Sequence, residues 1–216
     1  MIGDLDDVIN VDIKRCYQNH PKVNSENLLN ILKTHAFYNP DVGYCQGMNY
    51  VVGTLFIQLQ DEELAFKSLI GLIEKFNMMS LFNKDLHKLK LFFYQFDRLV
   101  GILLPEVHDR FKEEMISSSH FSSSWFMTIF SSILQDKPIL NEIWDYFLYK
   151  GWKVIFKAGI AVIMRISDFI VQNRFEDVMG LLAMVHHPSS PVQVFDSTFM
   201  DRVKRVSIPD SLLRDL

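Results

Sequence analysis

An aspartate and an arginine near the start of the sequence stand at a spacing that can orient a charged group. The pattern Ile9-x-x-Asp12-x-x-Arg15 has i, i+3 and i+6 spacing, which keeps the three residues near one face of a predicted helix. Asp12 can then pair with Arg15 and hold its guanidinium, a planar charged donor, in one orientation. Taken alone, the same pattern is typical of an ion pair on a solvated helix surface.

A second polar group, the Gln46 amide, is bracketed by two glycines. The run Gly43-Tyr44-Cys45-Gln46-Gly47-Met48-Asn49 stands before an apolar stretch that continues to Leu59. Glycine permits the backbone angles of a tight turn, so the run predicts a turn in which the amide caps a helix over 45–59. Taken alone, the run is a turn before a core helix.

A third segment, Ser122–Phe130, is rich in serine and aromatic residues. It reads SSSWFMTIF, and Pro138, the pair Trp144-Asp145 and Gly151 follow it. Taken alone, these residue types are typical of an amphipathic helical hairpin.

Several kinds of site are disfavoured by the residue pattern. The seven His are scattered, and neither Cys nor carboxylate stands at ligand spacing from the pair His186–His187, so we expect no bound metal. The chain lacks the Gly-rich nucleotide motifs, so we expect no cofactor, and any nucleotide belongs to a partner. Nothing in the sequence pairs Cys16 or Cys45 with a His, which disfavours a Cys–His nucleophile.

Composition describes a protein with a large apolar core. Of the 216 residues 49% are hydrophobic, and 18 Phe and 10 Met have to be packed. The net charge of −4, with mixed signs, gives no reason to expect nucleic acid as a partner.

Cysteine usage and hydropathy indicate the compartment. Cys16 and Cys45 could pair, but so large a core has little need of one disulfide, and nothing resembles a secretory signal. We therefore expect a cytoplasmic protein. The most apolar stretch, 152–166, is interrupted by two lysines and an arginine, so we expect no transmembrane helix.

The elements that must position these residues are helices. Apolar residues recur at helical spacing almost throughout, with helix starts at Ser25, Asp61 and Pro138. We predict an all-α fold with helices over 7–20, 25–38, 45–59, 62–77, 84–102, 105–116, 122–134, 138–150, 152–172, 174–186 and 191–204.

The serine run Ser117–Ser124 favours a boundary inside this helical chain. We expect one domain over 1–216, with an N-terminal catalytic subdomain over about 1–118 and a C-terminal helical subdomain over about 119–216. A serine run can equally be a capping turn inside one continuous domain.

In combination, the three patterns resemble the TBC family of domains. Their order and spacing match I-x-x-D-x-x-R, Y-x-Q-G-M and S-x-x-W-F, followed by W-D and a glycine that closes its helix. The resemblance runs from Ile9 to the helix near Ala183. It implies an all-helical fold of two subdomains, with the catalytic loop regions in the first.

The resemblance also implies an activity. TBC domains accelerate GTP hydrolysis on Rab GTPases by inserting an arginine and a glutamine into the partner's active site, and these map onto Arg15 and Gln46. An arginine delivered in trans is worth about 10³–10⁵ in rate, because charge develops on the phosphate oxygens. A glutamine amide can accept a hydrogen bond from the attacking water and donate one to the γ-phosphate. Such a protein is an activator that completes the active site of a GTP-bound Rab, and GTP and Mg²⁺ belong to that partner.

Four more residues receive supporting roles from the resemblance. Asp12 would hold Arg15 in its ready rotamer, and Tyr44 and Gly47 would shape the glutamine loop. Trp125 would support the site or the contact surface, with core packing as its alternative. Membrane association would be indirect, at endomembranes through the Rab partner.

Two departures from the family pattern leave alternatives open. The first motif commonly continues as R-T-F-P, whereas Arg15-Cys16-Tyr17-Gln18 lacks the threonine hydroxyl and the helix-ending proline, so efficiency can differ. The short lead-in predicts exposed apolar surface on Val8, Ile9 or Val11, or a segment supplied by a neighbouring molecule. The alternatives are a catalytically inactive TBC-like scaffold or adaptor that binds a small GTPase or another protein, and a helical adaptor unrelated to GTPases.

Overall fold

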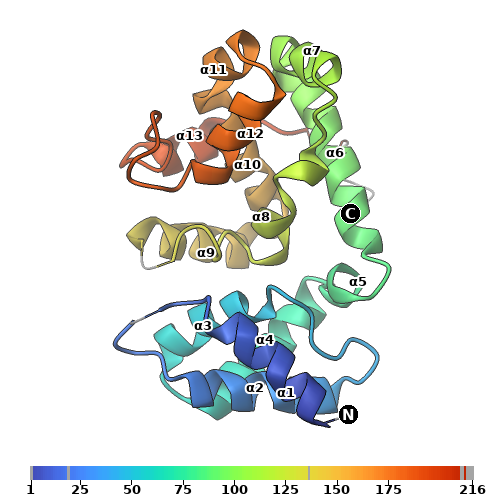
Figure 1. The fold of residues 1–216 in the computed structure, drawn as a ribbon, viewed down its shortest axis with the longest axis vertical. Helices are drawn as coiled ribbons and strands as arrows, with labels where there is room; N and C mark the ends of the chain where they lie inside the picture. The colour runs from blue at the N-terminus through green and yellow to red at the C-terminus, as the bar shows by residue number, and fades with distance from the viewer. Residues whose placement is uncertain (1, 19, 136, 210–211, 213–216) are drawn as a thin grey trace. The chain divides into compact units, whose positions relative to one another are not determined.

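The protein is described by a computed structural model that covers residues 2–18, 20–135, 137–209 and 212. Within these residues the chain forms thirteen α-helices, one 3₁₀ helix (η1) and no strand, which confirms the predicted all-α class (Figure 1). The elements are α1 (Ile2–Ile13), α2 (Ser25–Tyr38), α3 (Met48–Leu59), α4 (Glu62–Lys75), α5 (Met79–Phe82), α6 (His87–Leu103), α7 (Pro105–Glu113), η1 (Ser118–His120), α8 (Ser123–Met127), α9 (Pro138–Lys150), α10 (Lys153–Arg165), α11 (Ser167–Gln172), α12 (Phe175–Met184) and α13 (Phe199–Arg205).

The chain divides into two compact units. Unit 1 consists of Met1–Leu89 and Met127–Lys137, and unit 2 consists of Lys90–Phe126 and Pro138–Leu216. Residues 118 and 119, where the sequence placed a boundary, both lie in unit 2. The division differs because the segment 127–137 packs with residues of unit 1 that are far from it in the sequence.

Unit 1 is built on helices α1 to α4, with α2 packed against α1, α3 and α4 (Figure 1). The Asn24 side chain caps α2 by accepting a hydrogen bond from the Glu26 N–H at 3.0 Å, one residue before the predicted start. Asp61 caps α4 by accepting from the Leu64 N–H at 2.8 Å. The buried apolar side chains between these helices include Leu28, Leu32, Val52 and Leu69.

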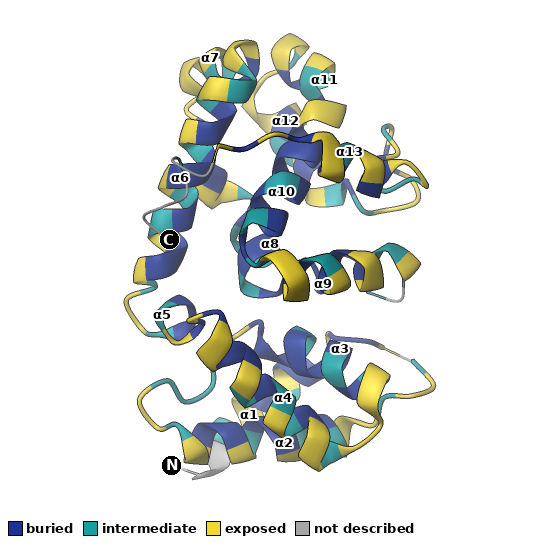
Figure 2. Ribbon diagram, turned by 180° about the vertical axis from the view of Figure 1, so that it is seen from behind, coloured by how far each residue is buried: buried dark blue, intermediate teal, exposed yellow. Residues whose placement is uncertain are grey.

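Unit 2 is built around α10, which packs against α9, α11 and α13. Nine of its residues are buried, and Figure 2 shows the helix coloured mostly as buried. Aromatic rings fill the space beside it: the ring centroids of Phe92, Phe126 and Phe156 lie 5.1–5.3 Å from one another. Among the described residues, no helix combines the length and the apolar character that crossing a bilayer requires.

Most of the predicted helices are present. Those over 25–38 and 138–150 are confirmed to the residue. The predictions over 45–59, 62–77, 84–102, 105–116 and 174–186 are confirmed with ends that move by up to three residues. The short elements α5 and η1 were not predicted.

Four predicted helices are wrong in extent. The helix predicted over 7–20 ends at Ile13, before Arg15, and residue 19 lies outside the described part of the chain. The helix predicted over 122–134 ends at Met127, because Ile129 and Phe130 take left-handed backbone angles, with φ of 52° and 63°. The helix predicted over 152–172 is interrupted at Ile166, and the one predicted over 191–204 begins only at Phe199.

Candidate functional site

Arg15 lies in a turn that follows α1. The N–H groups of Arg15 and Cys16 donate to the carbonyls of Asp12 and Ile13 at 3.1 and 3.0 Å, so the chain tightens into i→i−3 hydrogen bonds. Tyr17, with φ of 48°, then turns the backbone away from the helical direction. Arg15 pairs with Asp12 as predicted, but the contact is long: Arg15 Nη1 lies 3.9 Å from Asp12 Oδ1. The Arg15 side chain is 63% exposed.

Gln46 lies in the turn that precedes α3. Gly43 and Gly47 have φ of 64° and 107°, angles that favour glycine, and Gly47 is the N-cap residue of the helix. The prediction that Gln46 caps the helix is wrong, because the N-cap residue is Gly47 and it makes no side-chain cap hydrogen bond. The Gln46 side chain is exposed, and no hydrogen bond joins its amide to another described residue. Its donor and acceptor therefore face solvent.

A buried polar network joins the two turns. The Tyr44 hydroxyl donates to Asp12 Oδ2 at 2.8 Å, and Asn49 Nδ2 donates to the Asp12 carbonyl at 3.0 Å. Asn49 Oδ1 accepts from the Gly47 N–H at 3.1 Å. Asp12 and Asn49 are only 7% and 1% exposed, and a buried amide whose donor and acceptor are both bonded fixes its neighbours in direction. The turn that carries Arg15 and the turn that carries Gln46 are thus held by the same three side chains.

Asn49 is a site residue that the sequence did not reveal. It occupies the first turn of α3, where its neighbours Met48 and Val51 are fully buried. A buried polar residue needs hydrogen-bond partners, so an amide at the start of an apolar helix was the available signal. Gly47 is a local partner, but Asp12 comes from a distant part of the chain and carries no local pattern that points to Asn49.

Burial keeps one phenol and two thiols near the turns neutral. It raises the pKa of Tyr44, and the hydrogen bond to Asp12 raises it further, so the phenol stays a donor. Burial also raises the pKa values of Cys16 and Cys45 to about 11. Both cysteines are free thiols, and at neutral pH they are protonated and poor nucleophiles.

Arg15 and Gln46 line the same open depression in unit 1, about 420 Å³ in volume. Val8 and Val11 lie beside them and are 54% and 49% exposed, whereas Ile9 is fully buried. The predicted apolar exposure is therefore confirmed for two of the three residues. The lining consists of Asp7, Val8, Val11, Asp12, Arg15, Tyr44 and Gln46.

The remaining predicted site residues lie in packed regions. Gly47 is buried, and a Cβ at its position would stand 3.4 Å from Thr128 Cγ2, so the turn packs closely on the segment 127–137. Trp125 is 2% exposed in unit 2, with its ring centroid 5.3 Å from that of Phe121 and 6.2 Å from that of Phe96. Trp125 is not among the residues that line the depression.

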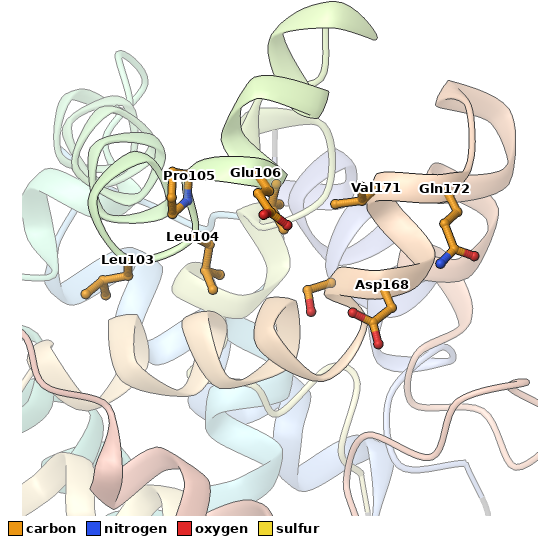
Figure 3. Close-up of a pocket in the computed structure, with 9 residues that line it drawn as sticks. Leu103, Leu104, Pro105, Glu106, Asp168, Val171 and Gln172 are labelled. Carbon is orange, nitrogen blue, oxygen red and sulfur yellow. The ribbon is translucent and has the colours of Figure 1, made fainter.

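A second hollow, about 470 Å³ in volume, lies in unit 2 at the start of α7. Figure 3 shows Leu104 and Glu106 on one side of it and Asp168 and Val171 on the other. None of the predicted site residues lines it. In the described part of the chain, no group of three or more His, Cys, Asp or Glu side chains is placed to hold a metal ion.

Curated relatives align with most of this chain. The human Ecotropic viral integration site 5 protein homolog is 30% identical over 185 residues, which cover 83% of this chain and 23% of that protein. The GTPase-activating protein GYP5 of Saccharomyces cerevisiae is 31% identical over 157 residues, 73% of this chain and 17% of its own length. The Caenorhabditis elegans Rab GTPase-activating protein eat-17 is 33% identical over 138 residues, 64% of this chain and 15% of its own length. The chain thus spans less than a quarter of each relative.

Solved structures and a family model agree with these relatives. The Chlamydomonas flagellar RabGAP TBC domain has a TM-score of 0.76 at 22% identity, over 92% of this chain and 66% of that one. The Ypt/Rab-GAP domain of Gyp1p has a TM-score of 0.70 at 17% identity, over 93% of this chain and 70% of that one. Both therefore show the same fold. The Rab-GTPase-TBC domain model matches residues 4–171, and the chain belongs to that family.

Proposed function

We propose that this chain is a GTPase-activating domain for a Rab-type GTPase and that it supplies Arg15 and Gln46 to the partner's active site. One observation carries the proposal: both side chains line one open depression on two turns that share a buried hydrogen-bond network. The names of the relatives GYP5 and eat-17 support the activity.

The arginine would act on the charge of the transition state. Phosphoryl transfer to water places charge on the phosphate oxygens, and a planar guanidinium can contact two of them at once. The exposed Arg15 side chain, tethered only at 3.9 Å by Asp12, can extend from the surface to reach such a group. Asp12 would limit the orientations of the guanidinium, so less entropy is lost when the partner binds.

The glutamine would orient the attacking water. Its amide has an acceptor for the water proton and a donor for the γ-phosphate. Gln46 is exposed and lines the same depression as Arg15. The residue after Gln46 is Gly47, and its N–H donates a hydrogen bond to the side chain of the buried Asn49. This bond fixes the turn that presents the Gln46 amide. A preorganised turn of this kind does not have to be ordered during the reaction.

The proposed partner would bring the rest of the chemistry. GTP and Mg²⁺ would arrive with the Rab, and the exposed Val8 and Val11 would contribute apolar contact area beside the two polar side chains. The protein would act in the cytoplasm and would reach endomembranes through the Rab.

Two activity measurements test the proposal. First, a panel of GTP-loaded Rabs is assayed for accelerated phosphate release in the presence of this chain. Second, a responsive Rab is remade with leucine in place of its own catalytic glutamine. If Gln46 supplies the water-positioning amide in trans, the parent chain still accelerates this Rab, and Gln46→Ala does not.

Thermal melting of the Gln46→Ala protein is the control for folding. Because the Gln46 amide bonds no described residue, its removal is expected to leave the melting temperature unchanged. A lowered melting temperature with normal specific activity would contradict the role of Gln46. Binding of GTP-loaded Rabs without acceleration of any of them would instead indicate the inactive scaffold.

A further inference from the structure

Thr54 lies where three segments of unit 1 meet. Thr54 belongs to α3 and is only 4% exposed. The Thr54 hydroxyl oxygen lies 2.6 Å from the Tyr17 hydroxyl, 2.8 Å from the Ser131 hydroxyl and 3.0 Å from the Tyr50 carbonyl. One hydroxyl therefore connects the turn that carries Arg15, helix α3 and the segment 127–137.

The Thr54 hydroxyl can serve several partners at once. A threonine hydroxyl has one proton and two acceptor lone pairs, and the Tyr50 carbonyl and the Ser131 hydroxyl are both within reach as acceptors of its proton. In the pair with Tyr17 either hydroxyl can be the donor, and the two oxygens lie 2.6 Å apart. The buried hydroxyl of Tyr17 is thus bonded to the Thr54 hydroxyl.

The same side of α3 holds the rest of the Arg15 turn. The Tyr50 hydroxyl donates to the Arg15 carbonyl at 3.3 Å. A Cβ at Gly53 would stand 2.5 Å from two ring carbons of Tyr17, so the ring lies directly on the backbone of the helix. From the other side, the Tyr17 N–H donates to the Gln135 side-chain oxygen. The Tyr17 ring packs on Gly53, its hydroxyl is hydrogen-bonded to Thr54, and its backbone N–H is hydrogen-bonded to Gln135.

From this geometry we infer that Thr54 is a positioning residue for Arg15; the inference rests on the proposed function. Tyr17 stands two residues after Arg15 with φ of 48°, a backbone region that a tyrosine occupies only when surrounding contacts hold it there. Thr54 supplies the contact that orients the Tyr17 ring. Loss of that contact releases the turn, and the Arg15 guanidinium then samples positions away from the phosphate.

A matched pair of variants tests the inference. Thr54→Val keeps the shape of the side chain and removes the hydroxyl, whereas Thr54→Ser keeps the hydroxyl. We expect Thr54→Val to lower the kcat of Rab-stimulated hydrolysis by about 10- to 100-fold, the size of effect that misplacing a catalytic group by an ångström produces. We expect KM and the affinity for GTP-loaded Rab to change only a few-fold, and Thr54→Ser to keep nearly the parent kcat.

Two further variants separate positioning from stability. Ser118→Ala in unit 2 removes a buried hydroxyl that donates to the Phe93 carbonyl at 3.1 Å. We expect Ser118→Ala to change the melting temperature about as much as Thr54→Val does and to leave kcat at the parent value. Tyr17→Phe removes the partner of Thr54, so the double variant with Thr54→Val should lose little more kcat than Thr54→Val alone. Fully additive losses, a kcat loss shared by Ser118→Ala, or a parent-like kcat in Thr54→Val would overturn the inference.

Amide hydrogen exchange makes the test independent of the GTPase. If the parent accelerates no Rab, the proposed function fails, but the Tyr17 amide still reports on the cluster. Faster exchange of that amide in Thr54→Val than in the parent and Ser118→Ala supports the positioning of the turn. Equal exchange in all three proteins overturns it.

Discussion

In unit 1 the residues that surround the two exposed side chains are joined by hydrogen bonds, whereas the centre of unit 2 is filled by aromatic rings. Asp12, Tyr44 and Asn49 form the network of unit 1, with donor–acceptor distances between side-chain and backbone atoms of 2.8–3.1 Å. In unit 2 the Trp152 ring centroid lies 4.8 Å from that of Phe92, which also contacts two further phenylalanine rings.

The two kinds of contact have different effects: hydrogen bonds fix the orientation of the turns, and aromatic packing stabilises the fold. A hydrogen bond is directional and contributes about 1 kcal/mol net, so the network of unit 1 fixes where its turns point more than it adds stability. A buried aromatic side chain contributes more, since removing one costs about 3–5 kcal/mol, but it tolerates more variation in angle. We therefore expect variants of the network in unit 1 to change the turnover of stimulated hydrolysis, and variants of the aromatic centre in unit 2 to change the stability of the protein.

The largest expected effect is that of Arg15→Ala. Loss of an arginine that acts in trans should lower stimulated hydrolysis by about 10³–10⁵, equivalent to roughly 4–7 kcal/mol at 1.36 kcal/mol per tenfold. Arg15→Lys should be nearly as poor, because lysine lacks the planar fork. Single-turnover phosphate release gives the rate, and titration with GTP-loaded Rab should show affinity within a few-fold of the parent. A kcat/KM close to that of the parent would end the arginine assignment.

An intermediate effect is expected from Gly159→Ala in unit 2. A Cβ at this position would stand 2.6 Å from Phe96 Cε2 and 3.4 Å from Trp125 Cε3, inside a packed aromatic centre. Overpacking of this kind costs about 1–3 kcal/mol, of which the better helix propensity of alanine returns roughly 0.5–1 kcal/mol. Chemical denaturation should therefore show reduced stability, while the kcat of the folded protein stays at the parent value.

Gly180→Ala provides the control for that substitution. Gly180 lies in α12 and is exposed, and a Cβ at its position would meet no neighbouring atom within 4 Å. Alanine there should be neutral or stabilise by about 0.4–1 kcal/mol. If Gly180→Ala destabilised the protein as much as Gly159→Ala, the aromatic packing would not be the cause.

The smallest expected effect is a pH dependence at His35. Burial lowers the pKa of His35 below the ordinary value of 6.5, and its Nδ1 lies 3.1 Å from the Gly43 carbonyl, at the start of the Gln46 turn. The unfolded chain then binds a proton more readily than the folded one, so this contribution to stability is complete above pH 6.5 and is lost as the pH falls toward the lowered pKa. Melting temperatures of parent and His35→Asn between pH 8 and pH 5 measure it. Equal slopes in the two proteins would assign the dependence to other groups.

The helices could largely be predicted from the sequence, because their signals are local. Apolar periodicity, Asp61 and Pro138 marked helix starts that the structure confirms. The errors fall where distant contacts override that periodicity. Tyr17 leaves the helical direction to pack on Gly53, and the chain after Met127 turns at Ile129 toward residues of unit 1.

The candidate site could be predicted only as far as its motifs reached. Arg15, Gln46, Asp12 and Tyr44 were predicted from the resemblance of three motifs to the TBC family, and the structure brings all four to one depression. Their roles in hydrolysis stay a prediction. Asn49 and the Thr54 cluster were missed. A polar residue in an apolar helix needs hydrogen-bond partners, but the local sequence does not identify which distant groups these are.

The discontinuity of unit 1 has a consequence for how the protein is made. Met1–Leu89 leaves the ribosome before Lys90–Phe126, whereas Met127–Lys137, which provides the neighbours of Tyr17 and Gly47, is synthesised only after it. Unit 1 therefore cannot be completed as a nascent chain by its first helices alone, unlike a domain that folds from one continuous stretch. A fragment that stops at Leu89 would carry both Arg15 and Gln46 and still lack the segment that braces their turns.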